Sequence, residues 1–537
     1  MGLTTHVKLL NIYQLKQFSF FILAAFTCFS ASTLQAQTTA TGYVFADANG
    51  NGKKDKSEKG IANVSVTNGQ EVVQTDNKGF YTLRVGNDDI ISVIKPSGYQ
   101  VPVNADNLPQ YFYIHKPQGS PQLKYRGVAP TGPLPKSIDF PLKPSTEKDN
   151  YTALIFGDPQ VYNQEQVDYF IKDVITEVEG IKNISFGISM GDEVGDKLDL
   201  FAAYTAAVKR VGIPWYNMMG NHDLNADAPT DSLSDESFEA HFGPATYAFN
   251  YGKVHFIILD NVLYPDPRDG RGYYGGLRED QLKFVENDLR HVPKDYLVVL
   301  TMHIPMSEPE FLFSSATRKR LFNAIKDFPN TLSISAHTHM QRQDFYVKGS
   351  EWLQDKPHHH FNIGTASGDF YSGLNDKDGT PISTMRDGTP KGYGFIHFKG
   401  NQYIIDYKVA GKDAADQMRI IAPEKLKKDS DTLAYIYVNF YTGAKNDQVQ
   451  YRIDGSEWKN MEQSIEFDPF YLAEVATWKS ITDKTKKARR PSNPAKSTHL
   501  WKGPISTRLP TGKHNIEVKA TDMFNRSFIQ KSTYTIE

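Results

Sequence analysis

The sequence predicts a multidomain protein in which a central α/β domain lies between an N-terminal and a C-terminal all-β sandwich domain. The chain has 537 residues, and at about 150 residues per domain this length corresponds to three or four domains. Residues 38–145 and 409–537 contain short alternating runs separated by turn residues, a pattern typical of β-strands. Residues 149–408 instead alternate apolar strand-like runs with helical periodicity, which indicates an α/β domain.

The composition excludes several classes of protein. A negative mean hydropathy excludes a polytopic membrane protein. Sixty Lys and Arg residues against sixty-two Asp and Glu residues give a formal net charge of −2, so nothing in the charge balance indicates a nucleic-acid partner. The chain has one cysteine, Cys28, which excludes an intrachain disulfide and a cysteine-based zinc site.

Residues 1–37 are interpreted as a secretory signal peptide. Lys8 and Lys16 precede the apolar run FSFFILAAF, and the small residue Ala36 lies near the expected cleavage point. The run is short for a membrane span, which needs about 20 residues. The alternative is an uncleaved single anchor. Cleavage would leave no stable membrane span, and we then expect a secreted or periplasmic protein, with cell-surface association as a further option.

The segment DANGNGKKDKSE in the N-terminal domain matches a twelve-residue calcium-loop pattern. Alternate oxygen side chains can converge on a hard cation, and Gly52 permits the sharp turn. Because the flanking residues are expected to be strands, the segment resembles the calcium loops of β-sandwich repeats in bacterial surface proteins. The alternative is a polar surface turn. The predicted calcium ligands are Asp47, Asn49, Asn51, Asp55 and Glu58.

Five short polar motifs in the central domain each follow an apolar strand-like run directly. Because ligands of an open α/β sheet gather outside the carboxyl ends of its strands, we expect these motifs to meet at one place. Their carboxylate, amide and imidazole groups together suit a pair of divalent transition metals. The motifs contribute Asp158 and Gln160; Asp192 and Asp196; Asn221, His222 and Asp223; His303; and His337 and His339.

In this order the five motifs resemble those of the calcineurin-like metallophosphoesterases, over roughly Asp149 to Lys408. The flanking segments, with FYIHKPQGSP before the domain and GTPKGYGFIHF at its end, resemble the N- and C-terminal modules of a bacterial secreted branch. The resemblance implies that the central domain is a sandwich of two mixed β-sheets flanked by helices.

The resemblance also implies two divalent transition metals, which are manganese, iron or zinc. The implied ligands are Asp158, Gln160 and His339 for the first metal, Asp192 for both, and Asn221, His303 and His337 for the second. His222 is expected to face the scissile phosphate, and Asp223 to orient His222. A metal-bound hydroxide would then attack the phosphorus of a small phosphate ester.

One position departs from the common pattern of this family. The first motif is usually Asp-x-His, but here it is Asp158-Pro159-Gln160. The amide oxygen of Gln160 is a poorer ligand for zinc or iron than imidazole, so the first site is expected to bind more weakly or to favour manganese. A similar glutamine occurs in a recognised branch of the family, so loss of activity does not follow.

Other polar residues of the central domain have less specific signals. Asp196 and Asp260 are expected to have structural roles, such as binding an arginine or capping a helix. The segment HHHFNIGTASGDFYSG is interpreted as a loop over the metal centre, with a polar strand edge as the alternative. The predicted substrate contacts are His360, Asp369 and Tyr393.

The C-terminal domain contains a basic segment, TKKARRPSNPAKSTHLWKG. It could steer an anionic substrate toward the metals, although such charge runs are more often simply solvated. Trp478 and Trp501 are candidates for an apolar shelf that binds a sugar or a neighbouring domain. The basic residues of the segment are Lys486, Lys487, Arg489 and Arg490.

The leading hypothesis is therefore an exported dinuclear-metal phosphoesterase that hydrolyses small phosphate esters. The motifs do not distinguish a phosphomonoesterase from a phosphodiesterase, and they predict no oligomeric state. A second hypothesis is a surface binding or adhesion protein with a catalytically silent phosphoesterase domain. A phosphoprotein phosphatase is less favoured, since export removes most phosphoprotein substrates.

Overall fold

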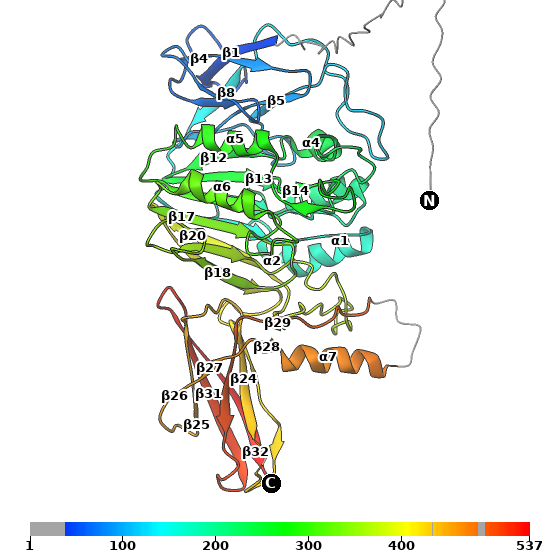
Figure 1. The fold of residues 1–537 in the computed structure, drawn as a ribbon, viewed down its shortest axis with the longest axis vertical. Coiled ribbons are helices and arrows are strands. Elements are labelled where there is room, and N and C mark those ends of the chain that lie inside the picture. Colours follow the sequence, from blue (N-terminus) through cyan, green and yellow to red (C-terminus); the bar gives the residue numbers. More distant parts are fainter. Residues whose placement is uncertain (1–37, 432, 482–488) are drawn as a thin grey trace, which may run out of the picture. The chain divides into compact units, whose positions relative to one another are not determined.

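The structure is a computed structural model that describes residues 38–431, 433–481 and 489–537 (Figure 1). The predicted signal peptide, residues 1–37, lies outside the described residues. Residues Thr38–Glu537 form one compact unit. Within the described ranges, no helix combines the length and apolar character that crossing a membrane requires.

The N-terminal region consists of two four-stranded sheets. Strand β4 shows how its sequence produces this layer, because Tyr81, Leu83 and Val85 are buried while Thr82 and Arg84 between them are exposed, as the two-residue period of a strand requires. One sheet has the order β4 (Phe80–Val85), β1 (Thr38–Ala46), β8 (Phe140–Pro144) and β6 (Tyr99–Gln100). The other has the order β3 (Val72–Gln74), β2 (Ser65–Thr67), β5 (Asp89–Val93) and β7 (Phe112–His115).

The central region contains two larger sheets, and both are mixed, as expected from the sequence. In the five-stranded sheet β9, β10 and β11 are parallel, whereas β20 and β21 are antiparallel to their neighbours. In the six-stranded sheet β13, β16, β17 and β19 are parallel, and the edge strands β12 and β18 are antiparallel. The first sheet has the order β11 (Trp215–Asn217), β10 (Phe186–Ser189), β9 (Asn150–Phe156), β20 (Gly392–Lys399) and β21 (Gln402–Val409). The second has the order β12 (Tyr247–Tyr251), β13 (Val254–Leu259), β16 (Leu297–Met302), β17 (Asn330–Ser335), β19 (His358–Asn362) and β18 (Arg342–Tyr346).

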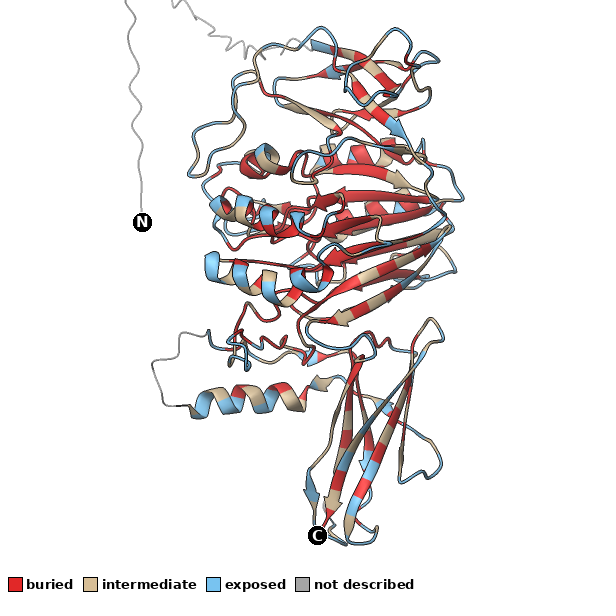
Figure 2. Cartoon of the chain, turned by 180° about the vertical axis from the view of Figure 1, so that it is seen from behind, coloured by how far each residue is buried: buried red, intermediate tan, exposed pale blue. Residues whose placement is uncertain are grey.

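The central strands bury side chains on both faces, which explains their continuous apolar sequences. In β9, Ala153 and Ile155 belong to a core that includes residues of both central sheets, whereas Leu154 and Phe156 belong to the core against the helices. Figure 2 shows these buried strands and the exposed outer faces of the helices. The helices are α1 (Gln164–Phe170), α2 (Thr176–Val178), α3 (Phe201–Lys209), α4 (Glu236–Phe242), α5 (Glu279–Asp288) and α6 (Ser315–Ile325), with a π-helical turn over Ile171–Ile175, 3₁₀ turns over Leu198–Leu200 and Asp231–Leu233, and a small ribbon of β14 (Val262–Leu263) and β15 (Tyr274–Gly275).

The C-terminal region contains two further sheets and one helix that the all-β prediction missed. Helix α7 (Pro469–Ser480) begins at Asp468, whose side chain accepts a hydrogen bond from the backbone N–H of Tyr471 at 2.8 Å. An Asp cap followed by proline at the first helical position is a helix-start signal that was present in the sequence. The strands are β22 (Met418–Ile421), β24 (Ala434–Phe440), β30 (Leu500–Ile505) and β27 (Glu462–Gln463) in one sheet, β23 (Lys425–Leu426), β32 (Ser527–Ile536), β31 (Gly512–Thr521), β25 (Gln448–Ile453) and β26 (Lys459–Asn460) in the other, and the pair β28 (Glu466–Phe467) and β29 (Lys496–Ser497).

Candidate metal centre

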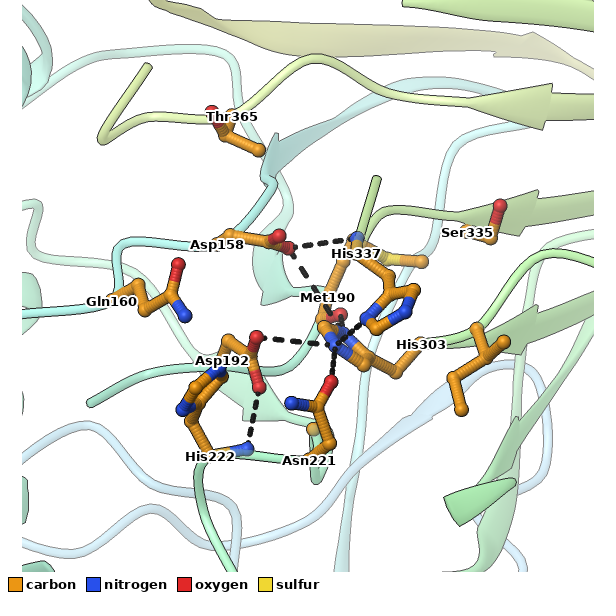
Figure 3. Close-up of polar contacts among 12 residues, drawn as sticks. Asp158, Gln160, Met190, Asp192, Asn221, His222, His303, Ser335, His337 and Thr365 are labelled. Carbon is orange, nitrogen blue, oxygen red and sulfur yellow. Dashed lines mark hydrogen bonds and ion pairs between the residues drawn. The ribbon is translucent and has the colours of Figure 1, made fainter. Parts of the chain in front are cut away.

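The predicted metal ligands gather where strands of the two central sheets end (Figure 3). Asp158 and Asp192 follow β9 and β10, and Asn221 follows β11. From the other sheet, His303 follows β16 and His337 follows β17. The strand ends therefore bring together polar groups that are far apart in the sequence: the backbone N–H of His337 donates to Oδ1 of Asp158, 179 positions away, at 3.2 Å.

His303 is surrounded by atoms that carry lone pairs. Its Nδ1–H donates to the carbonyl of Met190 at 2.8 Å, so Nε2 is the ring nitrogen that faces the cluster and that would bind a metal once deprotonated. That Nε2 lies 3.1 Å from Oδ1 of Asn221, 3.2 Å from Nδ1 of His337 and 3.3 Å from Oδ2 of Asp192. One ligand atom each of Asp192, His303 and His337 lies within 4.8 Å of the others. Such a cluster of acceptors fits a metal ion.

A second cluster of acceptors lies around Asp158. The Nδ1–H of His339 donates to the carbonyl of Gly368 at 2.6 Å, so its Nε2 carries the lone pair and lies 3.3 Å from Oδ2 of Asp158. Oδ2 of Asp158 and Oε1 of Gln160 are buried, and neither has a hydrogen-bond partner among the described residues. Buried oxygens are normally satisfied, so these two also fit a metal ion in their chemistry.

The backbone of the predicted ligands is strained. A non-glycine residue with a left-handed φ costs about 1–3 kcal/mol, and such residues cluster at functional sites. Five of the seven predicted ligands adopt this conformation. The backbone strain at these positions is therefore compatible with a functional site, where it directs the side chains of the ligands toward one another. The left-handed φ angles are 32° at Asp158, 39° at Gln160, 51° at Asp192, 69° at His337 and 51° at His339.

Two glycines of the motifs allow the ligands to approach each other. A Cβ atom on Gly191 would lie 2.6 Å from Nδ1 of His303. A Cβ atom on Gly220 would lie 2.2 Å from Oδ1 of Asp192. Both distances are shorter than van der Waals contact, so the GD and GN motifs need glycine because of this close approach.

The electrostatics of the buried cluster favour positive charge. Burial alone would lower the pKa of His303, but the carboxylates of Asp192 and Asp158 raise it to about 10. Burial raises the pKa of Asp158 to about 7, partly offset by His303. The pKa of His337 falls to about 3, because of burial and the nearby positive charge of His303. The two carboxylates therefore favour positive charge at this position, as they would favour a bound cation.

His222 lies at the exposed edge of this cluster and contacts Asp196. Its Nδ1 lies 2.7 Å from Oδ1 of Asp196, and its side chain is 26% exposed. Burial would lower the pKa of His222, but Asp192 and the hydrogen bond to Asp196 raise it to about 9. The imidazole is therefore protonated at neutral pH, and Asp196 has a direct role that the sequence analysis did not assign to it.

The prediction that Asp223 orients His222 is wrong. The Asp223 carboxylate is buried and accepts backbone N–H groups of Gly220 at 2.9 Å, Val194 at 3.1 Å and Glu193 at 3.2 Å. It therefore fixes the two loops that carry the second and third motifs. Asp260 is also buried and accepts the N–H of Val262 at 3.1 Å, in agreement with its expected structural role.

The prediction that His360 contacts substrate is also wrong. His360 is buried in β19, with Nδ1 2.7 Å from Oγ of Ser333 and Nε2 2.9 Å from Oγ of Ser335. Both ring nitrogens are thus used inside the sheet. The signal was present in the sequence, since the serines alternate along the neighbouring strand β17 and face the histidines of β19.

The two other predicted substrate residues are buried and bound to protein groups. Oδ2 of Asp369 accepts the N–H of Ser492 at 2.6 Å and the hydroxyl of Ser372 at 2.7 Å. Tyr393 donates its hydroxyl to Glu177 at 2.8 Å. Asp369 therefore connects the central and C-terminal regions, and Tyr393 anchors β20 to α2. Oδ1 of Asp369 has no hydrogen-bond partner among the described residues, and substrate contact by these two residues stays a prediction.

Three residues near the cluster were not predicted as parts of the site. The Phe370 ring stacks on the His339 ring with a centroid separation of 3.8 Å. The Arg489 guanidinium lies 4.4 Å from the centre of the Phe370 ring, and the Tyr162 hydroxyl accepts a hydrogen bond from Gln160 at 3.3 Å. Only Arg489 had a signal in the sequence, as part of the basic segment.

Of the other three basic residues named for this segment, the structure describes Arg490. Lys486 and Lys487 lie outside the described residues. Arg490 donates to Oδ1 of Asn493 at 3.0 Å on the surface. Trp501 is buried in the C-terminal core, so the apolar-shelf prediction is wrong for this residue.

The predicted calcium loop is compact in the structure. Asp47 accepts the N–H groups of Gly50 at 2.7 Å and Gly52 at 2.9 Å. Asp55 accepts the side-chain amide of Asn49 at 2.8 Å. These contacts stabilise a polar turn, and calcium binding stays a prediction. The two other predicted ligands also form hydrogen bonds within the loop. The side-chain amide of Asn51 donates to Asp55 at 3.0 Å, and Glu58 accepts the N–H of Ala48 at 2.9 Å.

Two family models match parts of the chain. The model described as the N terminal of calcineurin-like phosphoesterase matches residues 48–126. The model described as the C terminal of calcineurin-like phosphoesterase matches residues 360–528. Together these matches support the calcineurin-like phosphoesterase family for this chain.

Comparisons with individual proteins give more distant likenesses. Colossin-A of Dictyostelium discoideum is 43% identical over 70 residues, which are 12% of this chain and 1% of that protein, so the chain spans a small fraction of it. Purple acid phosphatase PPD1 from yellow lupin (Lupinus luteus) seeds has a TM-score of 0.36 and 12% identity, covering 70% of this chain and 73% of that one. Vps29 of Chaetomium thermophilum has a TM-score of 0.20 and 10% identity, covering 72% and 98%.

Proposed function

We propose that this chain is a dinuclear-metal phosphoesterase that hydrolyses small phosphate esters. The observation that carries the proposal is the convergence of lone-pair atoms around Nε2 of His303 and Oδ2 of Asp158. The expected metals are manganese, iron or zinc. When bound, two such ions would neutralise phosphoryl oxygens and lower the pKa of a water molecule.

The protein groups around the cluster support the roles proposed for them. The ligands are those predicted from the sequence, with Gln160 and Asp158 presenting buried oxygens that have no hydrogen-bond partner among the described residues. His222 is the proposed proton donor, because it is partly exposed and its pKa is raised to about 9. It would protonate the leaving oxygen or stabilise negative charge in the transition state. Asp196 would hold the Nδ1 proton, so that Nε2 faces the reacting group.

The test of this proposal uses full-length mature protein that has been stripped of metal by chelation. Samples reconstituted with manganese, iron or zinc are assayed on p-nitrophenyl phosphate and on its bis ester, and the metal is counted by emission spectroscopy. We expect two ions per chain and ester hydrolysis that Asp192→Asn abolishes. Asp199→Asn, an exposed change in the same region, is the matched control.

The same experiment separates the alternatives. Relative rates on the mono- and bis ester distinguish a phosphomonoesterase from a phosphodiesterase. A protein that binds two metals but hydrolyses no ester in a broad panel would favour the surface binding or adhesion protein. The absence of stoichiometric metal binding would contradict the proposed function directly.

We also propose export, cleavage near residue 37 and β-sandwich domains on either side of the phosphoesterase domain, with boundaries at 38–145, 149–408 and 409–537. The two pairs of terminal sheets support the domain proposal. N-terminal sequencing of the protein recovered outside the cytoplasm tests the cleavage.

A calcium ion in the N-terminal loop is the remaining proposal. Calorimetric titration with calcium tests it, with Asp47→Asn as the non-binding variant.

A further inference from the structure

Arg489 belongs to the C-terminal region, but its backbone is attached to a loop of the central region. The N–H of Gly373 donates to the carbonyl of Arg489 at 3.0 Å, and Ser372 and Arg489 form a parallel β-bridge. That loop follows β19 and contains Gly368, the residue to which His339 donates. The backbone contacts therefore attach Arg489 to the loop that carries Gly368 and Phe370.

The Arg489 side chain lies between two aromatic rings that contact residues of the candidate metal centre. On one side its guanidinium lies 4.4 Å from the centre of the Phe370 ring, which stacks on the predicted ligand His339 at 3.8 Å. On the other side it lies 5.9 Å from the Tyr162 ring, which lies 6.1 Å from the ring of His222. One aromatic ring thus separates Arg489 from a predicted metal ligand, and another separates it from the proposed proton donor.

The charge of Arg489 is available to a ligand. The residue is exposed, and its guanidinium contacts two rings and no carboxylate of the described residues. Two arginines of the central region are paired instead, Arg278 with Asp231 at 2.8 Å and Arg318 with Glu351 at 2.6 Å. A guanidinium beside an aromatic ring still presents planar donors that can form two parallel hydrogen bonds to a phosphate.

The backbone anchor and the two rings also restrict where this charge can go. A guanidinium stacked on Phe370 loses little further conformational entropy when an anion binds, whereas a free surface lysine would lose more. The residue also follows a segment rich in positive charge in the sequence. These features distinguish Arg489 from its neighbour Arg490, which donates to Asn493 and approaches no ring of the described residues.

We propose that Arg489 binds the phosphoryl group of the substrate and favours phosphate monoesters over diesters. The inference rests on the proposed function and adds a specificity residue supplied by the C-terminal region. A monoester phosphoryl group carries close to two negative charges near neutral pH and offers three terminal oxygens to a bidentate guanidinium. A diester carries one charge, and its second ester substituent replaces one of these terminal oxygens. The C-terminal region would therefore complete the substrate site.

The test compares Arg489→Gln and Arg489→Lys with Arg490→Gln in full-length, manganese-reconstituted protein. For Arg489→Gln we expect the KM for p-nitrophenyl phosphate to rise about tenfold with kcat little changed, since a charge-assisted bidentate contact is lost. Inhibition by inorganic phosphate should weaken by a similar factor. KM for the bis ester should change by less than about threefold, and Arg489→Lys should recover part of the loss.

Metal content and thermal melting measured on the same samples distinguish this role from a structural one, because both should match those of Arg490→Gln. If Arg489→Gln affects both esters equally, or changes KM and phosphate inhibition no more than Arg490→Gln does, the inference is wrong. If the parent protein hydrolyses neither ester, the proposed function fails. Calorimetric titration with inorganic phosphate then decides the inference separately, since phosphate affinity must still fall in Arg489→Gln and not in Arg490→Gln.

Discussion

Nδ1 of His222 lies 2.7 Å from Oδ1 of Asp196, and Asp196 follows the predicted metal ligand Asp192 by four residues. The adjacent residue Asp223 points the other way, into a buried network of backbone N–H groups. The carboxylate that controls the imidazole thus comes from the second motif, while the imidazole comes from the third. The geometry of the candidate proton donor therefore depends on the packing of two separate loops.

Replacing Asp196 by Asn is expected to lower the pKa of His222 and slow the reaction. Burial opposes the charged imidazole, and the carboxylates of Asp192 and Asp196 raise its pKa to about 9, so the ring stays protonated until the pH rises through that value. Without the Asp196 charge the proton is lost at lower pH, nearer the reference value of about 6.5. NMR titration of the metal-free protein measures this change.

The kinetic consequence of Asp196→Asn is a kcat lower by about 10- to 100-fold, with metal content unchanged, because a positioned acid contributes about 10²–10⁴-fold. Asp199→Asn, which changes an exposed carboxylate nearby, should leave both kcat and the His222 titration unchanged. A normal rate and an unshifted pKa in Asp196→Asn would show that the contact has no role in proton transfer.

The sequence predicted the metal ligands better than the residues that surround them, for a physical reason. Residues that follow parallel strands of one sheet lie at one edge of it, so the order of the motifs was sufficient to bring Asp158 and Asp192 together. His303 follows a strand of the other central sheet, and its approach to them depends on how the two sheets pack. The order of the motifs does not determine the direction of a side chain in a loop. For this reason the sequence analysis predicted Asp223, the neighbour of His222 in the chain, as its partner, whereas the structure has Asp196 there. Both carboxylates are equally polar in the sequence, whereas in the structure Asp223 is buried among backbone N–H groups and Asp196 is exposed, with a φ angle of 63°.

The substrate residues were missed for a related reason. A run of three histidines has an unusual composition, and it was interpreted as a polar loop. In the structure these histidines lie in a strand whose serine partners Ser333 and Ser335 make the polar atoms compatible with burial. Arg489, in contrast, depends on a β-bridge between segments more than 100 residues apart, which no local pattern predicts.

Gly220→Ala is expected to abolish metal binding without unfolding the protein. The added Cβ would lie 2.2 Å from Oδ1 of Asp192 and 2.3 Å from its backbone N, so the carboxylate must move out of the cluster. Gly86→Ala is the matched control, because its Cβ would meet no atom closer than 3.8 Å. Emission spectroscopy measures the metal, and circular dichroism measures the fold. Full metal occupancy in Gly220→Ala would contradict the assignment of Asp192 as a ligand.

His360→Ala is expected to destabilise the fold and leave KM unchanged. The change removes a buried ring that bonds Ser333 and Ser335, and it leaves two hydroxyls and a cavity, at a cost of about 2–4 kcal/mol in the free energy of unfolding. Urea denaturation measures this loss, and ester kinetics measure KM. His291→Ala, at an exposed position, should change neither. A raised KM with normal stability would restore the substrate role that the sequence suggested.

Gln160→His is expected to tighten the binding of the metal at the Asp158 side of the cluster. Oε1 of Gln160 is buried without a hydrogen-bond partner among the described residues, and an imidazole nitrogen at that position is a stronger donor to zinc or iron than an amide oxygen. After dialysis against a chelator, Gln160→His should retain more metal than the parent protein. Gln164→His, which adds an imidazole at an exposed helical position, controls for unspecific binding by the new ring. Equal metal retention in all three proteins would mean that residue 160 is not a ligand, and the first metal would then depend on Asp158, Asp192 and His339 alone.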